Sequence, residues 1–191
     1  MADIGCCDID LPVENDGDCN AASSGVFSVL ISCAKQVTLV TETGCPAPVI
    51  TDIETVDGAG TAGPSFYPIE NVIKASGWAF DYVSDPVAGN TTLSETVTIA
   101  TRVKTPAAMC ALRQYIGQYV TLLWQNNGTE TWNMTGRGKD LYVTQITGGT
   151  GTDASVDTVI TMVAADLRKP TYPVFITNTA TTTALIASVT A

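Results

Sequence analysis

The residue types that carry most protein chemistry are absent or scattered in this chain. It has no histidine, which removes the commonest general base, the commonest metal ligand and any Ser-His or Cys-His nucleophilic pair. Two carboxylate pairs, Asp52 with Glu54 and Asp81 with Asp85, have the residue types of acid–base catalysis. Nothing in the sequence brings either pair into an enclosed site. We therefore interpret them as surface charge and predict no catalytic residue.

Cysteine is the other reactive residue type, and its spacing does not favour a metal site. Five of the six cysteines lie in the first 45 residues, and the full set is Cys6, Cys7, Cys19, Cys33, Cys45 and Cys110. No C-x-x-C spacing occurs, and the adjacent first pair fits a zinc pattern poorly. We interpret most of them as free thiols of a reducing cytoplasm, several packed as small buried hydrophobes. A disulfide or metal cluster in the N-terminal arm is the alternative. The sequence predicts no metal and no cofactor.

Two segments have the composition of a ligand loop without its spacing. Gly136-Arg137-Gly138-Lys139 is similar to a phosphate-binding loop, but it lacks the G-x-x-x-x-G-K-[ST] frame and lies between two expected strands. A hairpin loop is the favoured interpretation. Residues 14–18 are similar to a calcium loop, but Pro12 would occupy the first position of the frame. A solvated acidic arm is favoured there.

Charge limits the classes of partner. The net charge is −10, and the first hundred residues carry fourteen acids against Lys35 and Lys74. A chain this acidic repels the phosphate backbone, so specific nucleic-acid binding is not expected. Residues 1–20 hold six acids and no base, unlike a secretory signal, and apolar runs are only a few residues long. We expect neither export nor a membrane.

The composition favours strands. Threonine occurs 29 times and valine 19 times, with glycine and asparagine or aspartate clusters at intervals. From Leu93 to Lys104, apolar residues at odd positions alternate with polar ones, which predicts a long strand with one buried face. Expected strands also include 26–31, 36–41 and the alternating aromatic stretch at 78–82.

One short helix is expected after the long strand. Thr105 is a candidate N-cap, Pro106 suits the first helical position, and Gly117 suits the stop. Three apolar residues between them have the spacing of one helical stripe, and they are Met109, Leu112 and Ile116. The pattern predicts a helix at about 106–116 that covers one side of the sheet.

The remaining elements are a hairpin, two strands and several irregular segments. Two strand-like runs, 119–125 and 130–135, flank the turn Asn126-Asn127-Gly128, which is a strong hairpin signal. Further strands are expected at 141–147 and 156–165. Residues 43–66 are interpreted as a long connection rich in proline and glycine. We expect a single domain over 1–191, with an acidic arm at 1–24 and a threonine-rich C-terminal tail at 171–191.

The order of these parts from about Phe66 to Ala165, slightly over half of the chain, is informative. The parts are Phe66-Tyr67-Pro68-Ile69-Glu70, the strand Trp78-Ala79-Phe80-Asp81-Tyr82, the threonine/valine strand, the helix Pro106 to Ile116 ending at Gly117, the strand Tyr119 to Trp124, the Asn-Asn-Gly turn, Gly136-Arg137-Gly138-Lys139-Asp140-Leu141, and Gly148-Gly149-Thr150-Gly151-Thr152 before the last strand. This order resembles the major tail tube proteins of tailed phages, especially those of Bacteroidetes-type hosts. No single part is diagnostic.

The resemblance implies a mainly β fold, a sandwich or barrel of the tail tube type with one flanking helix and extended arms, shared with type VI secretion and contractile injection systems. Such subunits form rings, typically hexameric, that stack into a hollow tube in the virion tail after synthesis in the host cytoplasm. The implied partners are further copies, the terminator, baseplate and tape-measure proteins and a sheath, with DNA as passing cargo. A negative lumen would let DNA slide.

Other functions stay open at the level of sequence. A tail terminator or a capsid decoration protein is the closest alternative, and only a tube protein would stack rings into a filament. A small hydrolase acting through carboxylates would need two acids facing one cleft. A binding module on a cell surface would need a secretory signal.

Overall fold

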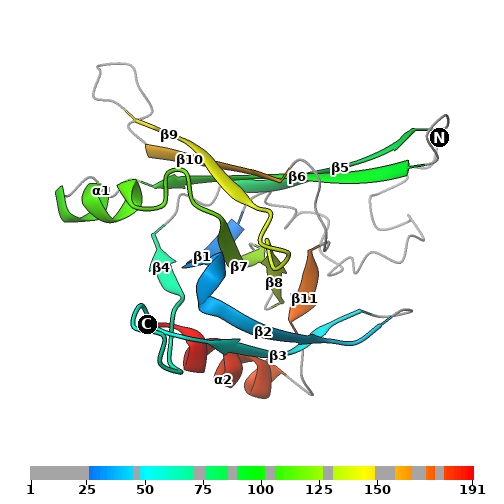
Figure 1. Ribbon diagram of the computed structural model, residues 1–191, viewed down its shortest axis with the longest axis vertical. Coiled ribbons are helices and arrows are strands. Elements are labelled where there is room, and N and C mark those ends of the chain that lie inside the picture. Colours follow the sequence, from blue (N-terminus) through cyan, green and yellow to red (C-terminus); the bar gives the residue numbers. More distant parts are fainter. Residues whose placement is uncertain are drawn as a thin grey trace, which may run out of the picture.

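The computed structural model describes residues 26–44, 48–70, 76–85, 90–101, 106–126, 131–148, 158–164, 171–174 and 179–191. Within them, the chain forms two β-sheets and two α-helices, α1 (Pro106–Arg113) and α2 (Thr179–Val189) (Figure 1). A short 3-10 helix, Ala34–Gln36, joins the first two strands. The mainly β fold expected from the sequence is therefore confirmed.

The larger sheet, here called the large sheet, has seven strands. Their spatial order is β2 (Val37–Glu42), β3 (Ile50–Thr55), β11 (Tyr172–Val174), β8 (Trp132–Thr135), β7 (Val120–Asn126), β1 (Val26–Cys33) and β4 (Tyr67–Ile69). The other sheet, the small sheet, has four strands in the order β5 (Gly77–Asp85), β6 (Asn90–Thr101), β10 (Thr158–Ala164) and β9 (Tyr142–Thr147). All pairings of the small sheet are antiparallel.

The elements stack in three layers, with the large sheet in the middle. In Figure 1 the small sheet lies at the top and α2 at the bottom, on opposite sides of the large sheet. Strand β1 divides its side chains accordingly, since Val29 and Ile31 join the core cluster shared with the small sheet and Leu30 joins the cluster shared with α2. This alternation follows from the period of two along a strand. At β1 the large sheet is thus covered on both faces.

Most of the strands and the helix expected from the sequence are present. On β6, Leu93, Val97 and Ile99 are buried, as the alternation predicts. Strands β7 and β8 pair antiparallel across the expected hairpin, with Leu123 opposite Met134. Helix α1 begins at Pro106, and Gly117 has φ +74°, a conformation suited to a glycine that stops a helix. The acidic arm at 1–24 lies outside the described residues.

Three expectations are wrong in detail. The segment 43–66 contains β3, whose Ile50 and Ile53 are buried and which pairs antiparallel with β2, so proline and glycine flank a strand there. Ile116 is 48% exposed because α1 ends at Arg113 and the following turn breaks the helical spacing. The loop 136–139 is not a hairpin, because it joins β8 of the large sheet to β9 of the small sheet.

The C-terminal segment, expected to be a threonine-rich tail, supplies β11 and α2. Threonine is a weak helix former, so packing stabilises α2 through Thr182, Ile186 and Val189, which are buried. The backbone N–H groups of Ser65 and Phe66 both donate to the Val189 carbonyl oxygen at 3.0 Å. The end of the chain is therefore part of the core.

Candidate functional site

The face of the small sheet that points away from the large sheet, here called the outer face, is a polar surface. Because side chains alternate along a strand and the odd positions of β6 face the core, its even positions lie on the outer face. Cross-strand pairing assigns the same face to Ala79 and Asp81 of β5, to Thr92, Ser94, Thr96 and Thr98 of β6, to Val159, Thr161 and Val163 of β10, and to Tyr142, Gln145 and Thr147 of β9. Among these positions Asp81 is the only charged residue.

The two outer strands of the small sheet, β5 and β9, each have one strand neighbour within the described residues. The beginning of the β9 edge is covered, because Val143 donates its N–H to the Gln118 carbonyl oxygen at 3.1 Å and accepts a bond from the Gly117 N–H at 3.2 Å. The stretch 144–147 of β9 extends beyond these bonds. An edge of this kind can pair with a strand of another molecule.

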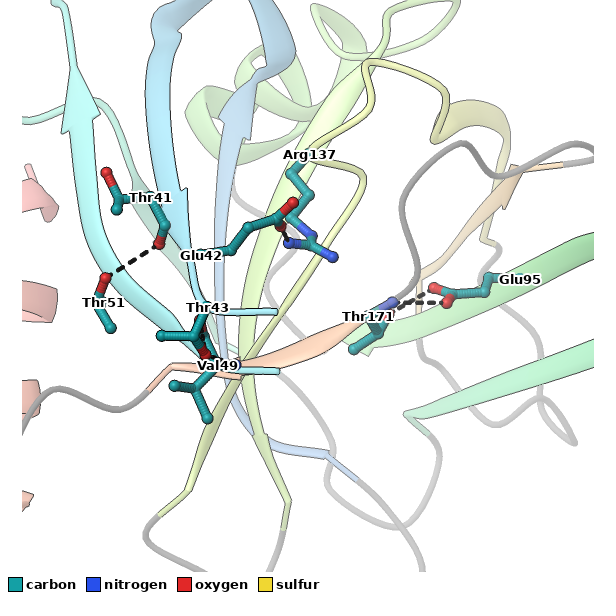
Figure 2. A network of polar contacts seen from close by, with 8 residues as sticks. All are labelled: Thr41, Glu42, Thr43, Val49, Thr51, Glu95, Arg137 and Thr171. Atoms are coloured by element: carbon teal, nitrogen blue, oxygen red, sulfur yellow. Dashed lines mark hydrogen bonds and ion pairs between the residues drawn. The ribbon is translucent and has the colours of Figure 1, made fainter. Parts of the chain in front are cut away.

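A buried carboxylate connects the small sheet to the large one. Glu95 of β6 is 1% exposed. It accepts hydrogen bonds from the Trp78 Nε1 at 3.1 Å, from the Thr171 backbone N–H at 3.1 Å and from the Thr171 hydroxyl at 2.6 Å. Figure 2 shows Glu95 directed at Thr171, the residue before β11. Because a buried carboxylate is costly unless it is hydrogen-bonded, these three donors are what make its burial tolerable.

Two tryptophans complete this connection. The rings of Trp78 on β5 and Trp124 on β7 lie 5.4 Å apart between the sheets. The Trp124 Nε1 donates to the Thr135 hydroxyl at 3.1 Å, and that hydroxyl also bonds the Thr171 hydroxyl. The polar contacts and the ring contact thus form a closed circuit through both sheets, which fixes the small sheet on the large one.

A second buried ion lies on the other side of β11. The Arg137 side chain is 1% exposed and forms an ion pair with Glu42 at the end of β2 (Figure 2). Its guanidinium lies 4.0 Å from the centre of the Tyr172 ring. The loop bends at Gly136, which has φ +79° and would place an added Cβ 2.5 Å from the Val120 carbonyl oxygen. Arg137 therefore serves packing and charge pairing, not phosphate binding.

The described carboxylates that were considered for catalysis are not gathered into an enclosed site. Asp52 and Glu54 are both exposed on β3, and Asp81 is exposed on the outer face. The side chain of Asp85 lies outside the described residues. The residue that sequence reasoning missed is Glu95, and the signal was an acid at an odd, core-facing position of the long strand.

The described cysteines are free thiols, in agreement with the sequence interpretation for these two. Cys33 is half-buried and Cys110 is exposed. The described part of the chain contains no group of three metal-ligating side chains. The four other cysteines lie outside the described residues, as does the calcium-like segment 14–18. None of the helices that the structure describes has the length and apolarity to cross a bilayer.

A cavity of about 560 Å³ lies beside α1, between the helix and strands β1 and β4, and its lining includes Cys33, Tyr67 and Tyr115. Burial, with smaller effects from Cys33 and Tyr67, raises the pKa of the Tyr115 hydroxyl to about 12. A tyrosine in this state stays neutral at physiological pH. Among the described residues that line the cavity, Glu70 is the one carboxylate, so the lining does not supply the two facing acids that a carboxylate-based hydrolase needs.

Comparison with known proteins gives no relative: no family model, no curated protein and no solved structure matches this chain.

Proposed function

We propose that this chain is a structural subunit that joins with further copies into closed rings, and that the rings stack into the hollow tube of a phage tail. The observation that carries the proposal is the small sheet. It has a polar outer face, two outer strands that can pair with another molecule, and a core-facing side fixed to the rest of the fold by the Glu95 circuit. The order of sequence elements that resembles tail tube proteins supports the same function.

The directions of the strands suit ring closure. The small sheet has four strands in alternating directions, so β5 and β9 run in opposite directions. A rotation about an axis along the sheet brings β5 of one copy to β9 of the next, and that contact is antiparallel like every pairing inside the sheet. A head-to-tail contact of this kind closes into a ring when the rotation allows it. Closure would also pair the sheet edges that otherwise promote aggregation.

The outer face suits the wall of a water-filled channel. Threonine and serine hydroxyls are solvated in such a lumen, and among the described outer-face positions none is basic. Phosphate groups of passing DNA therefore meet no lysine or arginine there, and Asp81 adds repulsion. Asp81 is the one acid among the outer-face positions whose side chains the structure describes, and the β5–β6 register places Asp85 at a further position of the same face.

The number of strands is compatible with passage of a macromolecule. With four strands from each copy, a hexamer would contain about 24 strands, more than the 16–18 of porins, which already leave an aqueous channel. The large sheet and α2 would lie outside this barrel, where a sheath would contact them. Terminator, baseplate and tape-measure proteins would contact the ends of the tube.

Negative-stain electron microscopy of the concentrated protein, with light scattering of the same sample, tests the proposal. We expect rings and hollow tubes whose fraction rises with concentration. Closed rings that never stack would instead support a terminator. A monomer that persists at every concentration would contradict the proposal.

A further inference from the structure

The small sheet carries an exposed aromatic side chain at one edge. Phe80 of β5 is 53% exposed. It lies opposite Glu95 in the β5–β6 register, so it belongs to the core-facing side of the sheet and not to the outer face. Its ring contacts Trp78 with 4.8 Å between centroids. An aromatic ring this exposed at an edge is a candidate anchor for an interface.

The opposite edge carries an apolar hollow on the same side of the sheet. Ile146 of β9 lies opposite Ile160, which is buried in the core, so Ile146 is also core-facing. A cavity of about 480 Å³ lies beside it and is lined by Cys110, Leu112, Arg113, Ile116 and Ile146. We call this cavity the α1–β9 hollow. Ile116 contributes a 48% exposed apolar side chain to it.

We propose that Phe80 of one copy packs into the α1–β9 hollow of its neighbour and is the apolar anchor of the ring contact. This inference rests on the proposed function, because the occupant is a second copy of this chain. Edge pairing alone does not select a partner or a register, since main-chain bonds are the same for any sequence. A side chain that fits a hollow selects both the partner and the register of the pairing.

The register of the sheet places the two groups together. Ile146, Ile160 and Ile99 form one cross-strand row, and the β5–β6 pairing extends this row to position 76. In a closed barrel with strands tilted by ~36°, the stagger is about one residue for each strand crossed. Crossing the small sheet therefore displaces the row by about four residues on the next β5. The row then reaches position 80 of the neighbour.

The handedness of the sheet sets the direction of this displacement. The Ala100 N–H donates to the Ser76 Oγ at 3.0 Å, so the even residues of β6 direct their main-chain groups to β5. This fixes the strand order as seen from the core side. For right-handed strand tilt, with the core outside the barrel, the displacement runs toward higher residue numbers on β5. Phe80, and not a residue before Ser76, therefore meets Ile146.

Charge is complementary at the same contact. Strand β5 contains Asp81 and Asp85 and no base, whereas the lining of the α1–β9 hollow contains Arg113 and no acid. Two acidic edges would repel each other if β5 met β5. The distribution favours β5 against β9 of a second copy.

Replacement of the anchor tests the contact. We expect Phe80→Ala to raise the concentration at which half of the protein is in rings about 30-fold, as for an interface hot spot. The matched control is Leu39→Ala, which changes a 48% exposed apolar residue on β2 of the large sheet and should leave ring formation unchanged. Native mass spectrometry measures the ring fraction, and circular dichroism shows whether each variant is folded.

A disulfide scan tests the register independently of affinity. If Ile146 lies opposite Phe80 of the neighbour, Thr147 lies opposite Ala79. The paired substitutions Ala79→Cys and Thr147→Cys should give an intermolecular disulfide on mild oxidation, identified by mass spectrometry of the linked peptides. The combination Ala79→Cys with Gln145→Cys, two residues out of register, should link far less. The unsubstituted chain gives the background from its own cysteines.

The outcomes separate this inference from the function on which it rests. Rings that form normally with Phe80→Ala, or that link only out of register, would overturn the anchor and leave the ring proposal standing. Failure of the unsubstituted chain to form rings under any condition would overturn both. Loss of rings in Phe80→Ala together with the 79–147 link supports both.

Discussion

The two sheets of this molecule differ in what surrounds them. At β1 and β7 the large sheet is covered on both faces, because these strands contribute buried side chains to both core clusters. Within the described part of the chain, the large sheet covers one face of the small sheet, and the other face consists mainly of threonine, serine and valine. The large sheet is therefore the part that stabilises the fold. The small sheet is the part that we propose contacts further copies.

The connection between the sheets is polar where it would be expected to be apolar. Glu95 and Thr171 link them beside the contact of Trp78 with Trp124. Hydrogen bonds are directional and apolar contacts are not, so this circuit fixes the orientation of one sheet on the other. A fixed orientation is what a ring needs, because a small angular error at each contact would prevent closure.

The largest effect on the free energy of unfolding is expected from a substitution in the layer between the large sheet and α2. Phe66 is fully buried there. Phe66→Ala should lower the free energy of unfolding by about 3–5 kcal/mol, because it removes an aromatic ring and leaves a cavity. Urea denaturation measures the change, with Leu39→Ala as an exposed control expected below about 1 kcal/mol. Equal losses in the two variants would contradict the assignment of the core.

The next largest effect on the free energy of unfolding is expected from Glu95, which connects the two sheets. Glu95→Gln replaces one acceptor oxygen by an amide that faces donors, and should lower the free energy of unfolding by about 2–3 kcal/mol. The control is Glu54→Gln on β3, which is exposed and should change it by less than about 0.5 kcal/mol. Both are measured by urea denaturation. An unchanged free energy of unfolding in Glu95→Gln would show that these hydrogen bonds are dispensable for stability.

A smaller effect is expected from Tyr115 at high pH. Its pKa is raised from 10.0 to about 12, so between these values the unfolded chain releases a proton that the folded chain keeps. Stability should therefore fall as pH rises through this window, by about 1 kcal/mol once solvent screening is allowed for. Tyr115→Phe should lose less stability than the unsubstituted chain from pH 10 to pH 12. Parallel curves for the two proteins would contradict the burial of this hydroxyl.

The smallest effect on folding is expected on the outer face. Thr96→Lys adds a cation to an exposed position and should change the free energy of unfolding by about 0.5 kcal/mol or less. Assembled tubes with this change should retain duplex DNA in a salt-dependent way, because each copy then presents a base to the lumen. Thr183→Lys on the exposed side of α2 is the control and should not retain DNA inside tubes. Equal retention by both variants would contradict a lumen lined by the outer face.

The sequence predicted those parts of the fold whose pattern is local. The alternation on β6, the helix start at Pro106 and the hairpin around Asn127-Gly128 follow from periodicity and turn chemistry. Helix α2 could not be predicted in this way, because its threonines disfavour a helix and only packing on the large sheet stabilises it. Glu95 is similar, since its partner Thr171 is 76 positions away in the chain.

The candidate site depends still more on long-range structure. The sequence indicates a polar face on β6 but not that β10 and β9 extend it, because strand order is a property of the whole fold. It also gives no means to predict that Phe80 and Ile146 lie at opposite edges of one sheet. These relations come from topology and register, which no local pattern encodes.

Cryo-electron microscopy of the assembled protein tests the central claim most directly. We expect a tube whose inner wall is a continuous antiparallel barrel made of small sheets, with threonine side chains toward the lumen and α2 on the outside. A wall in which the large sheet or α2 faces the lumen, or in which β5 and β9 of adjacent copies do not meet, would contradict it.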